Sequence, residues 1–126
     1  MIEGAGGWRV PLNDNESLSD LARALALPVI LVVGVRLGAL NHARLSAETI
    51  ARDGLELAGW IANVIDPHTA RLEDNIASLQ HWLPAPCLGV VPHLSAPTPA
   101  AIAAHLDIDA LLSGSTDTLT ISMETS

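Results

Sequence analysis

Apolar runs alternate along this chain with segments in which apolar residues recur every three to four positions. Val29–Val35 is rich in β-branched residues and lacks polar alternation, which is typical of a strand buried on both faces of a parallel sheet. Leu57–Ile65 and the shorter Cys87–Val91 repeat this pattern. Between them, helical spacing is marked by Leu40, Ala43, Ala47, Ile50 and Ala51 and then by Leu72, Ile76, Leu79 and Leu83. This order predicts an α/β fold, with a mostly parallel sheet and flanking helices.

Capping residues indicate where the helices begin and end. Ser17–Asp20 resembles a capping box, so the sequence predicts a short helix over residues 18–27. Gly54 is well placed to end the helix that follows the first long strand. Thr98, directly before a proline, predicts the start of a last helix. The apolar face of that helix carries Ile102, Leu106 and Leu111.

The end of the chain has a different composition. Residues 113–126 are mostly Gly, Ser and Thr, so they bury too little apolar surface to offset the entropy of ordering. We therefore expect one domain over residues 1–112 and a disordered Ser/Thr-rich tail over 113–126. The alternation of Leu119, Ile121 and Met123 leaves an edge strand as the alternative for this tail.

A glycine-rich segment, Glu3–Gly7, lies almost at the start of the chain. Such turns normally follow a strand, so we expect at most two strand residues before it. Glu3 then lies at the carboxyl end of that strand, where ligands bind in open α/β sheets and where a carboxylate can hold magnesium against a phosphate. The alternative is an ordinary turn in which Glu3 is solvated.

The junction Val35–His42, between the first long strand and its helix, is a second candidate site. A helix N-terminus presents free N–H groups and a positive dipole end, and Gly38 lets a ligand approach the backbone, so an anion fits there. The alternative is a tight turn in which Asn41 caps the helix. His42 has no His or Cys partner at metal-ligand spacing and is expected on the helix surface.

Three further residues carry groups of chemical interest. Asn63 lies late in the second long strand, where its amide must be paired because burying it unpaired costs free energy. Either the edge of a nucleotide base or a neighbouring loop would supply that hydrogen-bond partner. Asp66 precedes a proline, which indicates a turn rather than catalysis, and Cys87 is expected to be an inert core thiol.

The charge of the chain excludes several classes of function. It has 14 Asp plus Glu, six Arg and no Lys, which gives a net charge of −8. The arginines are scattered, so we expect no nucleic-acid binding. Because the chain has no lysine, it cannot supply the lysine of an ATPase phosphate loop.

The apolar run Leu27–Val35 is shorter than the roughly 20 residues of a membrane-spanning helix. A single cysteine and the lack of a signal-peptide pattern favour the cytoplasm.

Five blocks of the sequence resemble dethiobiotin synthetase in their order and spacing. These blocks are Glu3–Trp8, Leu27–Gly38, Asn41–Ala43, Leu57–Asn63 and Pro84–Gly89. The resemblance covers residues 2–112 and corresponds to the C-terminal half of that family's chain. It implies the C-terminal half of a Rossmann-like, P-loop NTPase-type domain. The blocks at 41–43 and 59–63 disfavour the related cobyrinate amidases and partition ATPases.

The resemblance implies a homodimeric, ATP-dependent cyclo-ligase of biotin biosynthesis. Such an enzyme joins carbon dioxide to 7,8-diaminononanoate as a carbamate, phosphorylates the carbamate from magnesium ATP, and closes the ureido ring with release of ADP and phosphate. This chemistry depends on neutralising charge at the transferring phosphoryl group and on positioning the second amine.

The resemblance also implies roles for the residues that match. The nucleotide-binding positions are Glu3, Gly4, Ala5, Gly6, Asn63, Val64, Pro92, His93 and Leu94. Among them, Glu3 is the magnesium ligand and Asn63 is the amide that reads adenine. The helix start that receives the carboxylate of the diamine, across the dimer interface, consists of Gly38, Ala39, Leu40 and Asn41.

The family's glycine-rich phosphate loop and its catalytic lysine fall outside this resemblance, and the chain holds no lysine to replace them. We therefore expect no catalytic residue in this chain and no ATP turnover by it alone. Because phosphate-loop strands are central in such sheets, we also expect an unpaired, aggregation-prone edge along Val29–Val35. A second hypothesis is a non-catalytic dimerisation or regulatory module that pairs with an intact synthetase.

Overall fold

The computed structural model describes residues 1–112 and the backbone of residues 119–123. The elements follow one another as β1 (Ile2–Ala5), α1 (Leu18–Leu25), β2 (Val29–Gly34), α2 (Ala39–Arg52), β3 (Leu57–Asn63), α3 (Leu72–Trp82), β4 (Cys87–Val91), α4 (Pro99–Ala103), α5 (Asp109–Leu112) and β5 (Leu119–Met123). The predicted strands and helices between residues 18 and 91 are confirmed, with ends that differ by no more than a few residues.

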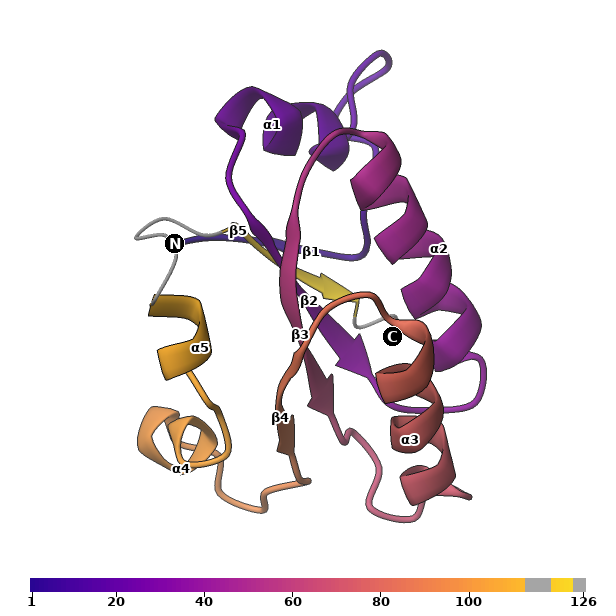
Figure 1. The fold of residues 1–126 in the computed structure, drawn as a ribbon, viewed down its shortest axis with the longest axis vertical. Helices are drawn as coiled ribbons and strands as arrows, with labels where there is room; N and C mark the ends of the chain where they lie inside the picture. Colours follow the sequence, from indigo (N-terminus) through magenta and orange to yellow (C-terminus); the bar gives the residue numbers. More distant parts are fainter. Residues whose placement is uncertain (113–118, 124–126) are drawn as a thin grey trace.

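The strands form one five-stranded sheet in the order β1-β5-β2-β3-β4, and all four pairings are parallel. Figure 1 shows α2 and α3 side by side against one face of this sheet, with α4 and α5 beyond β4 on the other side. The predicted α/β fold with a parallel sheet and flanking helices is therefore confirmed. No helix in the described part of the chain has the length and apolar character needed to cross a membrane.

The main core lies between β2, β3 and the two helices on that face. Leu31 and Val33 of β2 and Trp60 of β3 are fully buried or nearly so. They meet alanines on α2, among them Ala43 and Ala47, whose short side chains let the helix approach the sheet closely. The Trp60 indole Nε1 donates to the backbone carbonyl of residue 85 at 3.1 Å, so its one polar group is paired.

A second buried cluster joins the segment after β1 to the end of α2. Trp8, Ala22, Val29 and Ile50 pack together in it. At its edge, the Trp8 indole Nε1 donates to Asp53 Oδ2 at 2.6 Å. Because Asp53 ends α2 and Trp8 follows β1, this bond fixes the start of the chain to the helix.

The prediction of a single last helix is wrong, because the structure divides this segment into α4 and α5. Thr98 caps α4 as expected, since its hydroxyl accepts from the N–H of Ala101 at 3.1 Å. After α4 the chain leaves the helix and meets the outer edge of β4. There the Asp107 N–H donates to the Leu88 carbonyl at 2.7 Å, and Leu106 forms an antiparallel bridge with Gly89. A Cβ on Gly89 would lie only 2.1 Å from a backbone oxygen there, so this close approach requires glycine.

Two expectations about the chain ends are also corrected. β1 has four residues rather than two, so Glu3 lies within the strand and the glycine turn begins at Gly6, where φ is +93°. Residues 119–123 form β5 between β1 and β2, neither part of a disordered tail nor an edge strand. The rest of that predicted tail, 113–118 and 124–126, lies outside the described residues. β5 also pairs with Val29–Val33, so the edge expected to be unpaired has a partner.

Candidate functional site

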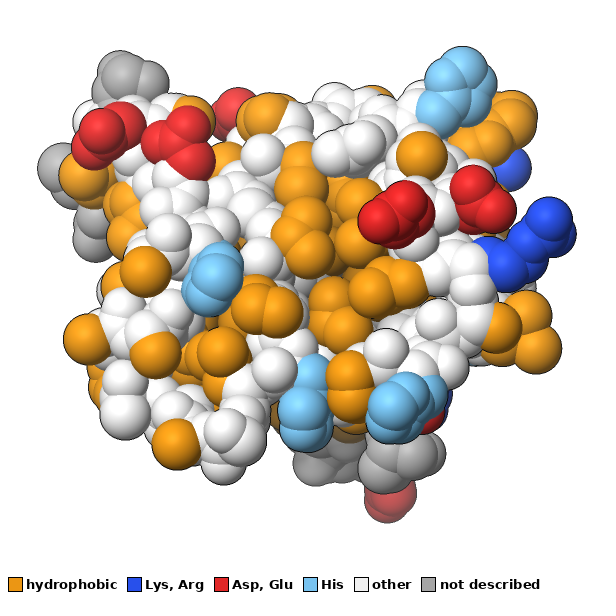
Figure 2. Space-filling view, turned by 90° about the horizontal axis from the view of Figure 1, so that it is seen from below, with side chains coloured by type: hydrophobic (Ala, Val, Ile, Leu, Met, Phe, Trp, Pro, Cys, Tyr) orange, Lys and Arg blue, Asp and Glu red, His pale blue; other side chains and the backbone are white. Residues whose placement is uncertain are grey.

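A hollow opens where the carboxyl ends of β2, β3 and β4 meet. Its volume is about 1080 Å³, comparable to the larger small-molecule sites in proteins. Figure 2 looks onto this end of the molecule and shows apolar side chains gathered at its centre. The lining residues are Val35, Arg36, Leu37, Asn63, Val64, Ile65, Asp66, His68, Thr69, Ala70, Val91, Pro92, His93, Leu94, Pro97 and Ile102.

Backbone hydrogen bonds align the carboxyl ends of β2, β3 and β4 at one edge of the sheet. The Val35 N–H donates to the Asn63 carbonyl at 2.9 Å, and the Val64 N–H donates to the Val91 carbonyl at 2.9 Å. These bonds continue the sheet ladder one residue beyond β2 and β3. The polar side chain at position 63 is therefore presented by a rigid element, which favours precise recognition.

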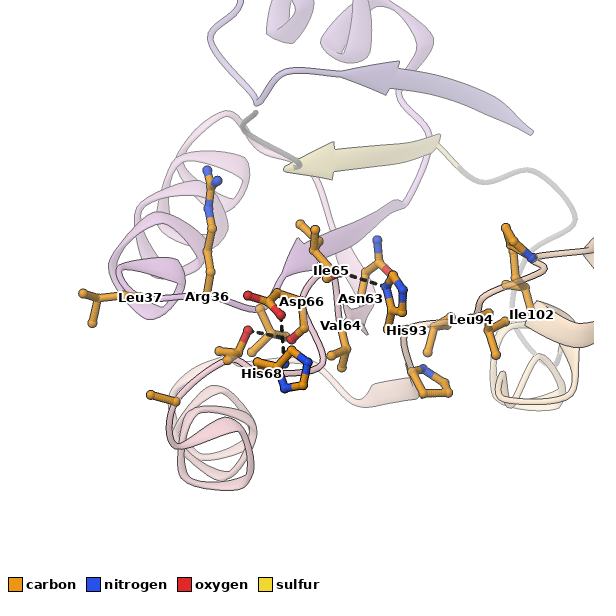
Figure 3. A pocket seen from close by; sticks show the side chains of 16 residues that line it. Arg36, Leu37, Asn63, Val64, Ile65, Asp66, His68, His93, Leu94 and Ile102 are labelled. Carbon is orange, nitrogen blue, oxygen red and sulfur yellow. Dashed lines mark hydrogen bonds between the residues drawn. The ribbon is translucent and has the colours of Figure 1, made fainter.

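A histidine ties the loop after β4 to the loop after β3. Nδ1 of His93 lies 2.9 Å from the Ile65 carbonyl oxygen. A carbonyl only accepts, so Nδ1 carries the proton and Nε2 of the neutral ring is left as an acceptor. Figure 3 shows the His93 ring beside Asn63, so two groups able to form hydrogen bonds stand together at the edge of an apolar hollow.

On the other wall, Asp66 organises a turn. Its Oδ1 accepts from the His68 N–H at 2.8 Å, and its carbonyl accepts from the Thr69 hydroxyl at 2.8 Å. The predicted turn role of Asp66 is confirmed. His68 is exposed, as are His81 and His105. His42 is exposed on α2, so its predicted position on the helix surface is confirmed.

The structure brings five of the predicted nucleotide-binding residues together in the hollow. These are Asn63, Val64, Pro92, His93 and Leu94. Sequence reasoning missed the apolar walls formed by Ile102 and Pro97, which reach the hollow because the chain after β4 folds back across the strand ends. Arg36 also lines the hollow, and Figure 3 shows its side chain extending away from Asn63 and His68.

The second predicted site is adjacent to this hollow. Gly38 is the N-cap of α2, with φ of +88°, and Leu37 before it lies at the rim. Asn41 is an exposed residue inside the helix, so the alternative in which it caps α2 is wrong. A left-handed residue is needed at the cap, and glycine adopts that conformation without strain. The Ala39 N–H donates to the Arg36 carbonyl at 3.0 Å, so the N–H groups that a helix start leaves for a ligand beside the hollow are those of Leu40 and Asn41.

Glu3, Gly4, Ala5 and Gly6 do not line the hollow, since β5 lies between β1 and the strands that form it. Glu3 is exposed. Within the described ranges, no three His, Cys, Asp or Glu side chains cluster closely enough to hold a metal ion. The Glu3 carboxylate can supply one ligand to a magnesium ion whose other ligands are phosphate and water, and it can supply no more than that.

A family model described as "AAA domain" matches residues 1–101. The chain belongs to this family, which is one of P-loop NTPases. Its relatives include the ATP-dependent dethiobiotin synthetase BioD of Pseudomonas aeruginosa strain UCBPP-PA14, which is 70% identical over 108 residues, 86% of this chain and 47% of the relative.

Two further dethiobiotin synthetases named BioD agree with this similarity. That of Cellvibrio japonicus is 60% identical and that of Ralstonia nicotianae is 55% identical, each over 112 residues, 89% of this chain and 49% of the relative. The predicted resemblance to dethiobiotin synthetase is confirmed. The chain spans about half the length of the curated relatives it matches.

Proposed function

We infer that this chain is the adenine-binding and diamine-binding part of an ATP-dependent dethiobiotin synthetase. The observation that carries this inference is the convergence of Asn63 with residues 92–94 at one hollow, in a chain up to 70% identical to such synthetases. The Asn63 amide has both donors and an acceptor, which matches the hydrogen-bonding edge of adenine. The apolar walls suit the two faces of a flat base.

The substrate's carboxylate is expected at the start of α2. Gly38 and Ala39 place no bulky side chain over the helix end, so an anion can approach the N–H groups and the positive end of the helix dipole. In such a synthetase the diamine is 7,8-diaminononanoate. ATP with magnesium supplies the phosphoryl group that activates the carbamate of this diamine, and Glu3 is the residue of this chain that would contact the metal.

Exposed apolar side chains at and near α2 and α3 support the proposal of a homodimer. Leu37, Leu45 and Trp82 are 96, 54 and 50% exposed, respectively. The guanidinium carbon of Arg44 lies 4.1 Å from the centroid of the Trp82 ring, so a cation–π contact joins α2 to α3 at this surface. The same surface favours the second candidate function, a non-catalytic module that pairs with an intact synthetase. Co-purification with a complete synthetase, with no effect of Asn63→Ala, would favour that candidate.

We predict that the chain alone forms no dethiobiotin above background. Phosphoryl transfer needs cations around the moving phosphoryl group. This chain offers no lysine, and the side chain of Arg36, at the hollow, points away from Asn63 and His68. The measurement is dethiobiotin formation by the purified chain with magnesium ATP, bicarbonate and the diamine. Product above the level of a heat-denatured sample would contradict this prediction.

A second prediction tests the adenine site directly. Titration of the chain with magnesium ATP should show no tight binding, whereas adenosine at millimolar concentration should shift NMR signals of Asn63, Val64 and His93. Asn63→Ala should weaken adenosine binding roughly tenfold, the equivalent of about one or two hydrogen bonds. The matched control is Asn15→Ala, since Asn15 is exposed and distant from the hollow. Equal affinities of the two variants, or shifts confined to other residues, would refute the site.

A further inference from the structure

The segment after β4 turns back and pairs with the outer edge of that strand. We call residues 97–107 the strap, since they run from the loop after β4, through α4, to this edge. Pro97 and Ile102 of the strap line the hollow, and Figure 3 shows Ile102 on the same side as Leu94, away from Asp66. The strap therefore joins one wall of the hollow to the edge of the sheet.

The strap is anchored on β4 through backbone groups. β4 is the last strand in the sheet order, so β3 leaves the N–H and C=O groups of its outer edge unpaired. Leu106 forms an antiparallel bridge with Gly89, and the Asp107 N–H donates to the Leu88 carbonyl at 2.7 Å. A Cβ at position 89 would lie 2.1 Å from the His105 carbonyl oxygen and 3.1 Å from Leu106 Cδ2. The strap can approach β4 this closely only because residue 89 is glycine.

The anchor and the wall are connected by α4. The Ile102 N–H donates to the Thr98 carbonyl at 3.0 Å, and the Ile102 carbonyl accepts from the His105 N–H at 3.0 Å. The Leu106 N–H then donates to the Ala103 carbonyl at 3.1 Å, so hydrogen bonds continue as far as the anchor. A helix of five residues is too short to be stable by itself. The position of α4, and of Ile102 on it, therefore depends on where the strap is attached.

We propose that Gly89 is a positioning residue for base binding, because the strap that it admits to the edge of β4 holds Ile102 as a wall against which the base packs. The proposal rests on the proposed function, since the ligand is an adenine base. Gly89 does not line the hollow, so it acts through the strap and touches no ligand. The Ile102 side chain has no hydrogen-bonding group, so it contributes apolar contact with the face of the base and does not read its edge.

The first experiment tests the anchor without a ligand. Asp107→Pro removes the N–H that binds the Leu88 carbonyl, whereas Asp107→Ala removes only the side chain and is the matched control. Proline is tolerated at a sheet edge, so the fold should persist. We expect the Ile102 and His105 amides to exchange at least roughly tenfold faster in Asp107→Pro than in Asp107→Ala, with a shift of the Ile102 methyl signals in Asp107→Pro only. Equal exchange rates, or unmoved methyl signals, would overturn the proposal.

The second experiment is a double-mutant cycle on adenosine binding, measured by NMR titration. Gly89→Ala and Ile102→Ala should each weaken binding roughly tenfold, because each takes the wall away from the base. Since both act on the same wall, the double variant should bind no more than about threefold more weakly than either single variant. Losses that multiply to roughly a hundredfold, or an unchanged affinity of Gly89→Ala, would overturn the proposal.

Gly54→Ala is the matched control for the glycine substitution. Gly54 has a φ of +83°, so alanine is strained there, but a Cβ would meet no atom within 4 Å and the position is outside the hollow. This variant should lose stability and keep its affinity for adenosine. An affinity loss equal to that of Gly89→Ala would overturn the proposal, because it would assign the effect to stability alone.

Two further outcomes are covered by these measurements. If Gly89→Ala does not fold, Asp107→Pro takes its place in the cycle with Ile102→Ala. If the unmodified chain binds no adenosine, the proposed function fails, and the exchange rates and methyl signals of the first experiment decide whether the strap positions Ile102.

Discussion

Replacing Trp60 by alanine is expected to lower the free energy of unfolding by roughly 3–5 kcal/mol, the usual cost of removing a large buried aromatic side chain. Trp60 is 0% exposed and packs in the middle of the main core. The substitution leaves a cavity between β3 and the helices, and it removes the hydrogen bond from the indole Nε1 to the residue 85 carbonyl. Domains of this size are stable by about 5–15 kcal/mol, so much of the stability is lost.

Trp82→Ala is the matched control for this substitution. Trp82 is 50% exposed, and its cation–π contact with Arg44 lies at the surface. We expect this variant to lose less than about 1 kcal/mol. Urea unfolding followed by far-UV circular dichroism measures both variants. Similar losses for the two would mean that Trp60 is not packed as the structure shows.

Asp53→Ala is expected to cost about 2–3 kcal/mol, the second largest effect. The carboxylate accepts from the Trp8 indole Nε1 at 2.6 Å and from Arg9 Nη2 at 2.8 Å. Trp8 is only 3% exposed, so its N–H would be left without an acceptor in a desolvated place. The Arg9 contact adds less, because the Arg9 side chain is 52% exposed and its charge is screened by solvent.

The same carboxylate makes stability depend on pH in the acid range. Burial raises the pKa of Asp53, but hydrogen bonds from Trp8 and Arg9, with the charges of Arg9 and Arg23, outweigh burial and lower it below its ordinary value of 3.8. A carboxyl whose pKa is lower in the folded state stabilises the fold above its unfolded pKa. That contribution disappears as the pH falls through the folded pKa.

Asp53→Asn should therefore flatten the dependence of unfolding free energy on pH below roughly pH 4. Asp74→Asn is the control, since the Asp74 side chain is 76% exposed and its ion pair with Arg71 lies at the surface. Urea unfolding at a series of pH values gives the slopes. A slope for Asp53→Asn equal to that of the unmodified chain would contradict the assigned cause. Asp20 contributes in the same direction, because the Ser17 N–H and hydroxyl lower its pKa.

Much of the fold was predictable because it depends on local patterns. The buried strands around Leu31 and Trp60 have few polar residues, and α2 and α3 have apolar residues at helical spacing. The break between α4 and α5 was not predictable in this way. It depends on a hydrogen bond from Asp107 to Leu88, which are far enough apart in the chain that no local pattern records it.

The candidate site was predictable to a similar degree. Asn63 was predictable as a site residue because an amide late in a buried strand needs a partner, and the structure places it at the hollow. The N-cap at Gly38 was harder to predict. Asparagine is common at N-caps, so Asn41 was an equally good candidate, and only the backbone angles identify Gly38 as the N-cap. No feature of its own segment would place Ile102 at the hollow.

The pairing of β1 with β5 also affects the order in which the sheet forms. Ile2 is aligned with Leu119, so this pairing closes a loop that contains almost the whole chain. Contacts between residues so distant in sequence are slow to form, whereas β2, β3 and β4 follow one another through short connections. We therefore expect β1 to join the sheet late in folding, after β2, β3 and β4 have paired with one another.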